Sequence, residues 1–320
     1  MDLLVDLLFF LGGLVALYFG AEWLVGGSSR LATSFGIRPV VVGLTLVAFG
    51  TSAPELVVSG LASLRGSGDL AVGNVVGSNI ANIALILGIS ALIRPIRVHP
   101  GILVRDVPIM IGFALLFLLV ALSGTIGRFE GTALLGLFAL YMVHLVRDAR
   151  QEANGRTPSV AEEEVLELLP QKEISRPREV VLVVLGMVGL VIGAQLLVHA
   201  ATSVARSLGV SEVIIGLTLV AFGTSVPELA ASVVASIRAE AQIVMGNIVG
   251  SNIFNIALVL GAAAVLRPLP VDESLLYFET PLMIALSLLL LPFVYKLCLE
   301  RWEGGVLLAG YAGFLIWIFV

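Results

Sequence analysis

The sequence predicts an all-α integral membrane protein of ten transmembrane helices, arranged as two inverted-topology five-helix repeats with broken helices 2 and 7. Three observations support this prediction. Hydrophobic residues make up 58% of the 320 residues and charged residues only 13%, whereas soluble domains carry about 25% charged residues. The apolar residues form long runs. Two motifs each occur twice at the same offset of 173 residues (43 to 216 and 73 to 246). We therefore expect lipid to surround most of the chain.

The predicted helices are the apolar runs that are long enough to cross a bilayer, which takes about 20 residues. These runs are residues 3–27, 40–64, 70–93, 103–123, 129–147, 179–202, 213–237, 241–266, 275–295 and 303–320. The first run is too long for the apolar part of a signal peptide, and Asp2 and Asp6 stand where a signal peptide carries basic residues. We expect it to be the first membrane helix.

One long polar segment, residues 148–178, separates helices one to five from helices six to ten. It contains the acidic run Glu162, Glu163 and Glu164, together with two basic clusters. We therefore expect a first five-helix repeat over residues 1–147, a linker over residues 148–178 and a second, inverted repeat over residues 179–320.

Lysine and arginine residues predict the orientation, because cytoplasmic loops carry an excess of both. Those on the side of the linker are Arg30, Arg38, Arg94, Arg97, Arg105, Arg147, Arg150, Arg156, Lys172, Arg176, Arg178, Arg238, Lys296 and Arg301. Those on the other side are Arg65, Arg128, Arg206 and Arg267. This distribution predicts that the linker is cytoplasmic and that both termini lie outside.

The repeat relates residues on opposite sides of the membrane. Arg65 and Arg238 stand at the repeat offset (65 to 238), yet the ten-helix arrangement places them on different sides. Five helices are an odd number, so the second copy must enter the membrane upside down. Inverted repeats of this kind are typical of secondary transporters, whose substrate site lies at the midplane between broken helices.

The first motif predicts the helix breaks. Residues 43–56 return as residues 216–229 with a single difference, Ala53 against Val226, and residues 73–85 return in similar form as residues 246–258. Pro54 and Pro227 stand inside predicted helices, and proline has no N–H to bond the carbonyl four residues earlier. A carbonyl freed at membrane depth is tolerated only where protein, water or an ion satisfies it. We therefore expect each break to face a polar site.

Each break carries a carboxylate, Glu55 or Glu228. A charged side chain at the bilayer centre costs at least about 3 kcal/mol, and two that face each other cost more unless a cation lies between them or one takes up a proton. Neutral oxygens accompany them at Thr51, Ser52, Ser78, Asn82, Thr224, Ser225, Ser251 and Asn255. Such hydroxyls can also simply join membrane helices.

Oxygen ligands without sulfur or imidazole suit hard cations such as Ca²⁺, and the same oxygens can hold Na⁺. Two carboxylates neutralise one Ca²⁺, whereas three Na⁺ would leave the site positive. Exchange at that ratio would therefore move charge across the membrane.

Both Gly-Thr-Ser-x-Pro-Glu segments and both Gly-Asn-x-Val-Gly-Ser-Asn-Ile-x-Asn segments resemble the α repeats of sodium/calcium exchangers in the cation/calcium antiporter superfamily. The resemblance is greatest to the compact prokaryotic members and covers the whole ten-helix chain. It implies an antiporter in the plasma membrane of a prokaryote that exchanges Na⁺ for Ca²⁺ by alternating access. Helices one and six would slide across a fixed core.

The resemblance also implies a set of site residues. Glu55 and Glu228 would ligate Ca²⁺, together with backbone oxygens of Thr51 and Thr224. The flanking Na⁺ positions would draw on the carbonyls of Ala48 and Ala221 and on Thr51, Thr224, Ser52, Ser225, Ser78 and Ser251. Asn82 and Asn255 would line the middle position.

One departure from the family pattern bears on the coupling ion. Asn255 stands where potassium-dependent exchangers and a close archaeal branch carry Asp, which argues against K⁺ co-transport. The alternative is a proton/Ca²⁺ antiporter on the same fold, with Glu55 and Glu228 as proton carriers. Relatives of that kind usually have Gly-Asn before the carboxylate, where this chain has Gly-Thr-Ser-x-Pro, so Na⁺ is favoured.

Other classes of function have less support. A passive channel needs a continuous pore, whereas inverted repeats suit alternating access. No Ser–His pair or carboxylate dyad with a substrate groove suggests an intramembrane enzyme. Cys298 is the only cysteine, which excludes an internal disulfide. No basic stripe or aromatic platform indicates nucleic acid. We expect Ca²⁺, Na⁺ and the lipid bilayer as partners, no resident cofactor and no obligate protein partner.

Overall fold

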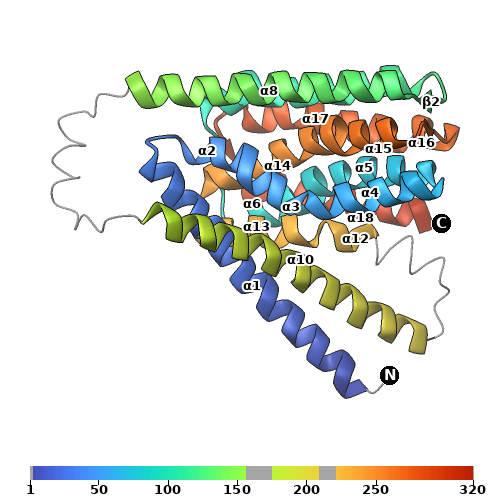
Figure 1. Cartoon of the computed structure of the whole chain (residues 1–320), viewed down its shortest axis with the longest axis horizontal. Helices are drawn as coiled ribbons and strands as arrows, with labels where there is room; N and C mark the ends of the chain where they lie inside the picture. The colour runs from blue at the N-terminus through green and yellow to red at the C-terminus, as the bar shows by residue number, and fades with distance from the viewer. Residues whose placement is uncertain (1–2, 156–174, 209–220, 320) are drawn as a thin grey trace.

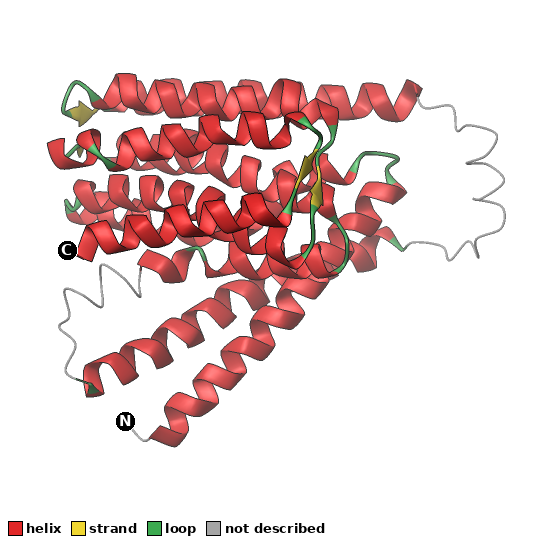
Figure 2. Cartoon of the chain, turned by 180° about the vertical axis from the view of Figure 1, so that it is seen from behind, coloured by secondary structure: helices red, strands yellow, loops and turns green. Residues whose placement is uncertain are grey.

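The computed structural model describes residues 3–155, 175–208 and 221–319, and within them the chain is almost entirely helical. Figures 1 and 2 show a bundle of roughly parallel helices, from which α1 (Leu3–Ser34) and α10 (Arg176–Ser207) slant away together. The predicted all-α class is confirmed.

The helical elements of the first half follow the predicted runs. After α1 they are α2 (Pro39–Val42), the π-helical segment η1 (Gly43–Val47), α3 (Ala48–Thr51), α4 (Ala53–Arg65), α5 (Gly68–Ile80), the π-helical segment η2 (Ala81–Ile86), α6 (Leu87–Ile93), the π-helical segment η3 (Ile102–Asp106), α7 (Val107–Ala121) and α8 (Arg128–Gly155).

The described elements of the second half follow a similar order. After α10 the elements are α12 (Ala221–Thr224), α13 (Val226–Ile237), α14 (Ala241–Phe254), the π-helical segment η5 (Asn255–Leu260), α15 (Gly261–Leu266), α16 (Glu273–Tyr277), α17 (Glu279–Tyr295) and α18 (Arg301–Phe319). The first part of the predicted seventh helix, residues 213–220, and most of the predicted linker lie outside the described residues.

Among the described residues, seven helices are long and apolar enough to span a membrane. One further pair, Pro39–Thr51 and Ala53–Arg65, meets the same test as a single span bent by 46°. Large apolar side chains such as Leu8, Val184, Leu119 and Leu140 are exposed on the outside of the helices. In a bilayer these side chains face the acyl chains, so the chain is a multi-pass membrane protein.

Two spans form the centre of the bundle. In the most apolar 18-residue window of each span, 72% of the residues of Gly68–Ile93 and 83% of those of Ala241–Leu266 are buried. In the other five spans the buried share of this window is 22% to 44%. These central spans contain the second pair of repeated motifs. Their burial explains why they can carry polar residues: their side chains face protein rather than lipid.

Glycines bring α1 and α10 into close contact. A Cβ placed on Gly20 would lie 2.9 Å from the carbonyl oxygen of Gly186, and a Cβ on Gly13 would lie 2.9 Å from that of Gly193. Without side chains at these positions, the two backbones pack directly against each other, as small-residue faces allow in membranes. Arg30 Nε on α1 also donates a 2.7 Å hydrogen bond to Glu179 on α10.

Two short ribbons mark the ends of the bundle. Strand β1 (Ile96–Arg97) pairs with β4 (Cys298–Leu299), and β2 (Thr125–Ile126) pairs with β3 (Leu269–Pro270), both antiparallel. We call the end with β1 and β4, where α8 ends and α10 begins, the linker end, and the opposite end the far end. Arg105, shortly after β1, donates a hydrogen bond to Asp148 near the end of α8. This contact shows that the β1–β4 ribbon and the end of α8 lie at the same end of the bundle.

Three helices are longer than the predicted spans. The first span was expected to end at residue 27 and the fifth at residue 147, but α1 continues to Ser34 and α8 to Gly155. α10 extends from Arg176 to Ser207, beyond the expected limits of 179 and 202. The length of an apolar run reports the thickness of the hydrocarbon, and a helix can continue past it into the polar interface.

Candidate cation site

The predicted breaks occur at Ser52 and Ser225. Ser52 has φ −85° and ψ 5°, and Ser225 has φ −87° and ψ 1°, so both leave the helical region between two helices. Pro54 and Pro227 lie in the first turn of the helix that follows, where a missing N–H is harmless. Each break ends one short helix and starts another inside the bundle.

The breaks determine where the two carboxylates lie. Glu55 is in the first turn of α4 and Glu228 is in the first turn of α13. The first turn of a helix exposes backbone N–H groups and the positive end of the helix dipole, which favours negative charge. Both side chains are buried, with 0% and 1% of their surface exposed. These are the only glutamates inside the repeated motifs.

Hydrogen bonds between the two halves bring the breaks together. Ser52 Oγ donates to Glu228 Oε1 at 2.9 Å, and Ser225 Oγ donates to Glu55 Oε1 at 3.4 Å. Each carboxylate is therefore contacted by the hydroxyl beside the other break. Ser225 Oγ also lies 3.1 Å from Ser78 Oγ in α5, so the cluster extends to the second motif.

Several buried oxygens in this cluster have no hydrogen-bond partner among the described residues. They include Glu55 Oε2 and Glu228 Oε2, Ser251 Oγ and Asn255 Oδ1, and both polar side-chain atoms of Asn82 are also without partners. A buried polar group left unpaired costs about 1–3 kcal/mol, and a charged one costs more. All of these atoms belong to residues that the sequence predicts as cation ligands. Such a set of free acceptors is suited to a cation.

The predicted residues Thr51 and Thr224 face the opposite half. Thr51 Oγ1 lies 3.2 Å from Asn247 Oδ1, and Thr224 Oγ1 lies 3.3 Å from Asn74 Oδ1. Thr51 is buried, as is Thr224. These contacts hold each threonine in place beside its break.

Two serines that the sequence analysis missed support this arrangement. Asn74 Nδ2 donates to Ser59 Oγ and Asn247 Nδ2 donates to Ser232 Oγ, both at 3.0 Å. Ser59 and Ser232 stand at the repeat offset (59 to 232). The repeat register is therefore the signal that could have identified them.

Asn82 and Asn255 lie in π-helical segments, η2 and η5. A π-helical turn holds more than four residues, shifts the hydrogen-bond ladder and occurs often at functional sites. Asn255 Nδ2 donates to Asn79 Oδ1 at 3.0 Å, which leaves its own Oδ1 free. The two central spans thus change their helical pitch where the second motifs carry amides.

The remaining predicted residues are the two alanines. Ala48 is buried, and its carbonyl oxygen accepts the N–H of Ser52 at 2.9 Å and lies 3.4 Å from Thr51 Oγ1. Ala221 is the first residue of α12, and the motif residues before it lie outside the described residues.

The charge of the site matches a divalent cation. Among the residues that the structure describes, no group of three or more His, Cys, Asp or Glu side chains is arranged to hold a metal ion. The cluster instead combines two carboxylates with neutral hydroxyl and amide oxygens. Oxygen cages of this composition bind Ca²⁺ and other hard cations.

Comparisons with known proteins agree with this chemistry. The family model described as sodium/calcium exchanger protein matches residues 5–147 and residues 178–320. A protein of Alkalimonas amylolytica described as putative antiporter CaxA is 39% identical, with 99% of each chain covered. The sodium/calcium exchanger MaX1 of Methanosarcina acetivorans is 36% identical, with 98% of this chain and 99% of MaX1 covered. A solved structure of the sodium-calcium exchanger NCX_Mj is 32% identical in sequence and superimposes with a TM-score of 0.85. The match covers 98% of this chain and 99% of the NCX_Mj chain.

Proposed function

The chain belongs to the sodium/calcium exchanger family, and from this premise we propose that it exchanges Na⁺ for Ca²⁺ across the membrane. One observation supports the proposal above all. Glu55 and Glu228 are buried, each is contacted by a serine beside the other break, and each keeps one oxygen without a partner among the described residues. A pair of buried carboxylates with free oxygens is costly unless a cation occupies the space between them.

In this mechanism Ca²⁺ binds between Glu55 Oε2 and Glu228 Oε2, with backbone oxygens of Thr51 and Thr224 as further ligands. Na⁺ ions take the flanking positions instead, using the carbonyls of Ala48 and Ala221 and the side chains of Ser52, Ser225, Ser78 and Ser251. Asn82 and Asn255 line the middle position. Two carboxylates balance one Ca²⁺, so exchange against three Na⁺ is electrogenic. The cations are the cargo, and the site needs no resident cofactor.

We further propose that the chain crosses the membrane ten times as two inverted repeats, residues 1–147 and 179–320. Among the described residues, eight spans meet the criteria of length and composition if the bent pair is counted as one; α13 is the described part of a ninth, and α18 is the tenth. The repeat offset relates matching contacts in the two halves, such as Asn74 with Ser59 and Asn247 with Ser232. The family model also matches the two halves separately.

The proposed orientation places the linker, residues 148–178, in the cytoplasm of a prokaryotic cell and both termini outside. The excess of lysine and arginine at the linker end supports it. Alternating access would then require α1 and α10 to move as a pair across the central spans, since their glycine contacts and the Arg30–Glu179 ion pair bind them to each other.

An ion pair at the linker end holds α1 against the core. Arg238, which follows α13, pairs with Glu22 on α1, and Ser29 Oγ donates to Glu240 Oε1 at 2.8 Å. The repeat counterpart of Glu22 is Gln195 (22 to 195), which cannot form an ion pair. The linker end therefore has a latch of a kind that the far end cannot copy.

Alternating access implies two states of the protein, one open to each side of the membrane. We expect Glu22→Gln to lower the population of the state in which α1 is held by the Arg238–Glu22 pair. A partly exposed ion pair contributes about 0–1 kcal/mol, so the shift in population is at most about fivefold. Because apparent affinity scales with the population of the competent state, the Ca²⁺ half-saturation concentrations on the two sides should change in opposite directions. Side-specific flux assays in vesicles of known orientation measure this. An equal change on both sides would contradict the latch.

The coupling ion is tested by Ca²⁺ uptake into proteoliposomes. We expect uptake to require an outward Na⁺ gradient, to survive a protonophore and to generate a membrane potential. A K⁺ gradient of the same size serves as the control and should drive no uptake. Uptake that ignores Na⁺ and follows the pH gradient would instead establish the alternative, a proton/Ca²⁺ antiporter with Glu55 and Glu228 as proton carriers.

A further inference from the structure

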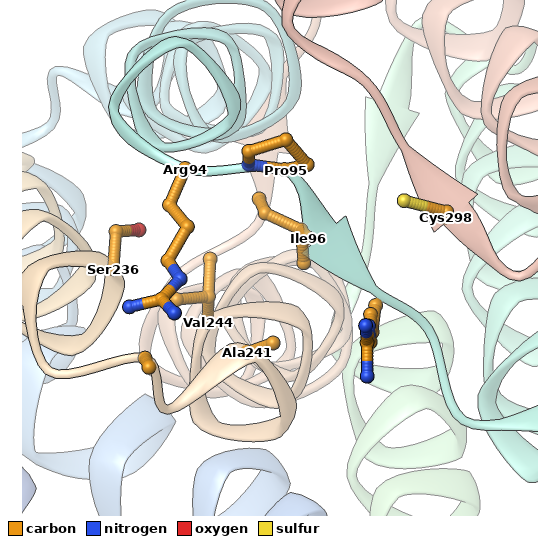
Figure 3. A pocket seen from close by; sticks show the side chains of 9 residues that line it. Arg94, Pro95, Ile96, Ser236, Ala241, Val244 and Cys298 are labelled. Carbon is orange, nitrogen blue, oxygen red and sulfur yellow. The ribbon is translucent and has the colours of Figure 1, made fainter.

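A pocket of about 530 Å³ lies at the linker end, where the ends of α6, α13 and α14 meet the β1–β4 ribbon. Its lining residues are Arg94, Pro95, Ile96, Arg97, Ser236, Ala239, Ala241, Val244 and Cys298. Figure 3 shows the guanidinium of Arg94 extending between Ser236 and Val244. None of these residues takes part in the proposed cation site.

The inverted repeat supplies a counterpart of this pocket at the far end, against which it can be compared. Arg94 corresponds to Arg267 (94 to 267), and Ala239 corresponds to Gly66 (66 to 239). At the far end, the Arg267 guanidinium lies directly against Gly66, since a Cβ there would be 2.8 Å from Arg267 Nη1. At the linker end, the Cβ of Ala239 occupies the equivalent space, so the Arg94 guanidinium cannot pack against the backbone there as Arg267 packs against Gly66.

The serine of the pocket also differs from its counterpart. At the far end, Ser63 Oγ donates to the carbonyl of Ala263 at 2.7 Å. The corresponding Ser236 (63 to 236) is 3% exposed, and its hydroxyl has no partner among the described residues. A buried hydroxyl without a protein partner, in a residue that lines a pocket, is free to bond a group that enters the pocket.

The pocket is positively charged. Arg94 and Arg97 both line it and are exposed, and neither guanidinium group forms an ion pair or side-chain hydrogen bond among the described residues. Two unpaired guanidinium groups exclude a role as a path for Ca²⁺ or Na⁺. Guanidinium groups instead bind phosphate through paired N–H donors.

Ala239 has the left-handed backbone conformation that closes the C-terminal end of α13. Its φ of 65° is uncommon for a residue other than glycine. The far end uses glycine, with φ 87°, at the same repeat position. Each residue closes the end of its helix, with its N–H bonded to the carbonyl of Ser236 or Ser63, so the two ends differ by the methyl group that Ala239 carries.

From these observations, we propose that the linker-end pocket binds a phosphate-bearing anion through Arg94, Arg97 and the Ser236 hydroxyl. The bound anion would join the end of α6 and the β1–β4 ribbon to the end of α13, and so bridge the two halves of the chain. In the orientation proposed above the pocket faces the cytoplasm. The anion can come from a soluble phosphate ester or from the headgroup of an anionic lipid, because both present the same group to the arginines.

Cys298 provides a built-in reporter, since it lines the pocket and is the only cysteine of the chain. The experiment measures the rate of Cys298 modification by a maleimide in the full-length protein in neutral detergent. Inorganic pyrophosphate is added at constant ionic strength, with chloride as the control anion. At a concentration ten times its Kd, pyrophosphate should slow the modification about tenfold, in proportion to the unoccupied fraction.

A second arm distinguishes the two sources of the anion. The same rate is measured in nanodiscs of phosphatidylcholine with and without phosphatidylglycerol. Protection by pyrophosphate in detergent supports a soluble phosphate ester, and protection by phosphatidylglycerol alone supports a lipid headgroup. The absence of protection in both arms would overturn the proposal.

Three variants complete the test. Arg94→Gln together with Arg97→Gln should abolish protection, whereas Arg267→Gln at the far end is the matched control and should retain it. Ala239→Gly relieves the backbone strain and frees the space into which Arg94 can fold. It should therefore weaken protection at least severalfold in a protein that is no less stable. Unchanged protection in the double variant or in Ala239→Gly would refute the assignment. Ca²⁺ exchange is not the readout, so this outcome leaves the proposed transport function untouched.

Discussion

We expect Glu55→Gln and Glu228→Gln each to abolish Ca²⁺ transport while leaving a folded protein that can be extracted. Glutamine keeps the size of the side chain and an oxygen that can accept the bond from the serine opposite, Ser225 or Ser52. It removes one of the two negative charges that face the cation. At about 4 Å and an effective dielectric of about 20, one unit charge contributes about 4 kcal/mol per charge on the cation.

That energy corresponds to a loss of affinity of about a thousandfold or more. The fold should not suffer, because a buried carboxylate with an unpartnered oxygen becomes a neutral amide. In the absence of Ca²⁺ both variants should therefore be at least as stable as the parent, and Ca²⁺ should no longer raise their Tm. Radioactive Ca²⁺ uptake into proteoliposomes and thermal unfolding with and without Ca²⁺ measure the two effects.

Asp69→Asn is the matched control, because Asp69 is an exposed carboxylate at the far end, in the first turn of α5. It should retain both transport and stabilisation by Ca²⁺. Full exchange in either glutamine variant would mean that the carboxylates are structural and that the cation is held elsewhere.

The breaks at Ser52 and Ser225 could be predicted from the sequence because their cause is local. A proline without an N–H disrupts its own helix wherever the helix packs. The meeting of the two breaks could also be predicted, since inverted repeats place equivalent residues on either side of the midplane. The bonds from Ser52 to Glu228 and from Ser225 to Glu55 follow that symmetry.

The π-helical pitch at Asn82 and Asn255 could not be predicted in the same way. One wide turn changes the periodicity by a single residue, and a span that is buried on most sides has no single apolar stripe against which to detect the change. Ser59 and Ser232 could not be predicted as part of the site either, because serines in membrane helices usually bond their own backbone. Their roles depend on Asn74 and Asn247, which only the packed structure brings to them.

The linker-end pocket depends on a difference between the repeats rather than on their likeness. The sequence reads Gly66 in one copy and Ala239 in the other. Nothing local reveals that Ala239 adopts a positive φ, or that Arg267 occupies the space beside Gly66. The consequence of one methyl group becomes visible only when both ends of the bundle are compared.

We expect Gly186→Leu to abolish transport by separating α1 from α10. A Cβ on Gly186 would lie 2.5 Å from the backbone nitrogen of Leu24 and 2.7 Å from the carbonyl oxygen of Gly20. Both contacts are with backbone, so no rotation of a side chain can relieve them. Overpacking a tight contact typically costs about 1–3 kcal/mol, occasionally more, and here the helices must move apart along their shared face.

Gly186→Ala should show a smaller loss, because only one methyl group has to be accommodated. Gly136→Leu in α8 and Gly310→Leu in α18 are the controls, since a Cβ at either glycine meets nothing within 4 Å. Exchange activity in proteoliposomes, together with the yield of monodisperse protein, measures each effect. If these controls transport normally and Gly186→Leu does so as well, α1 and α10 are not bound into a unit. The sliding of that pair across the central spans would then have to be replaced by independent movement of the two helices.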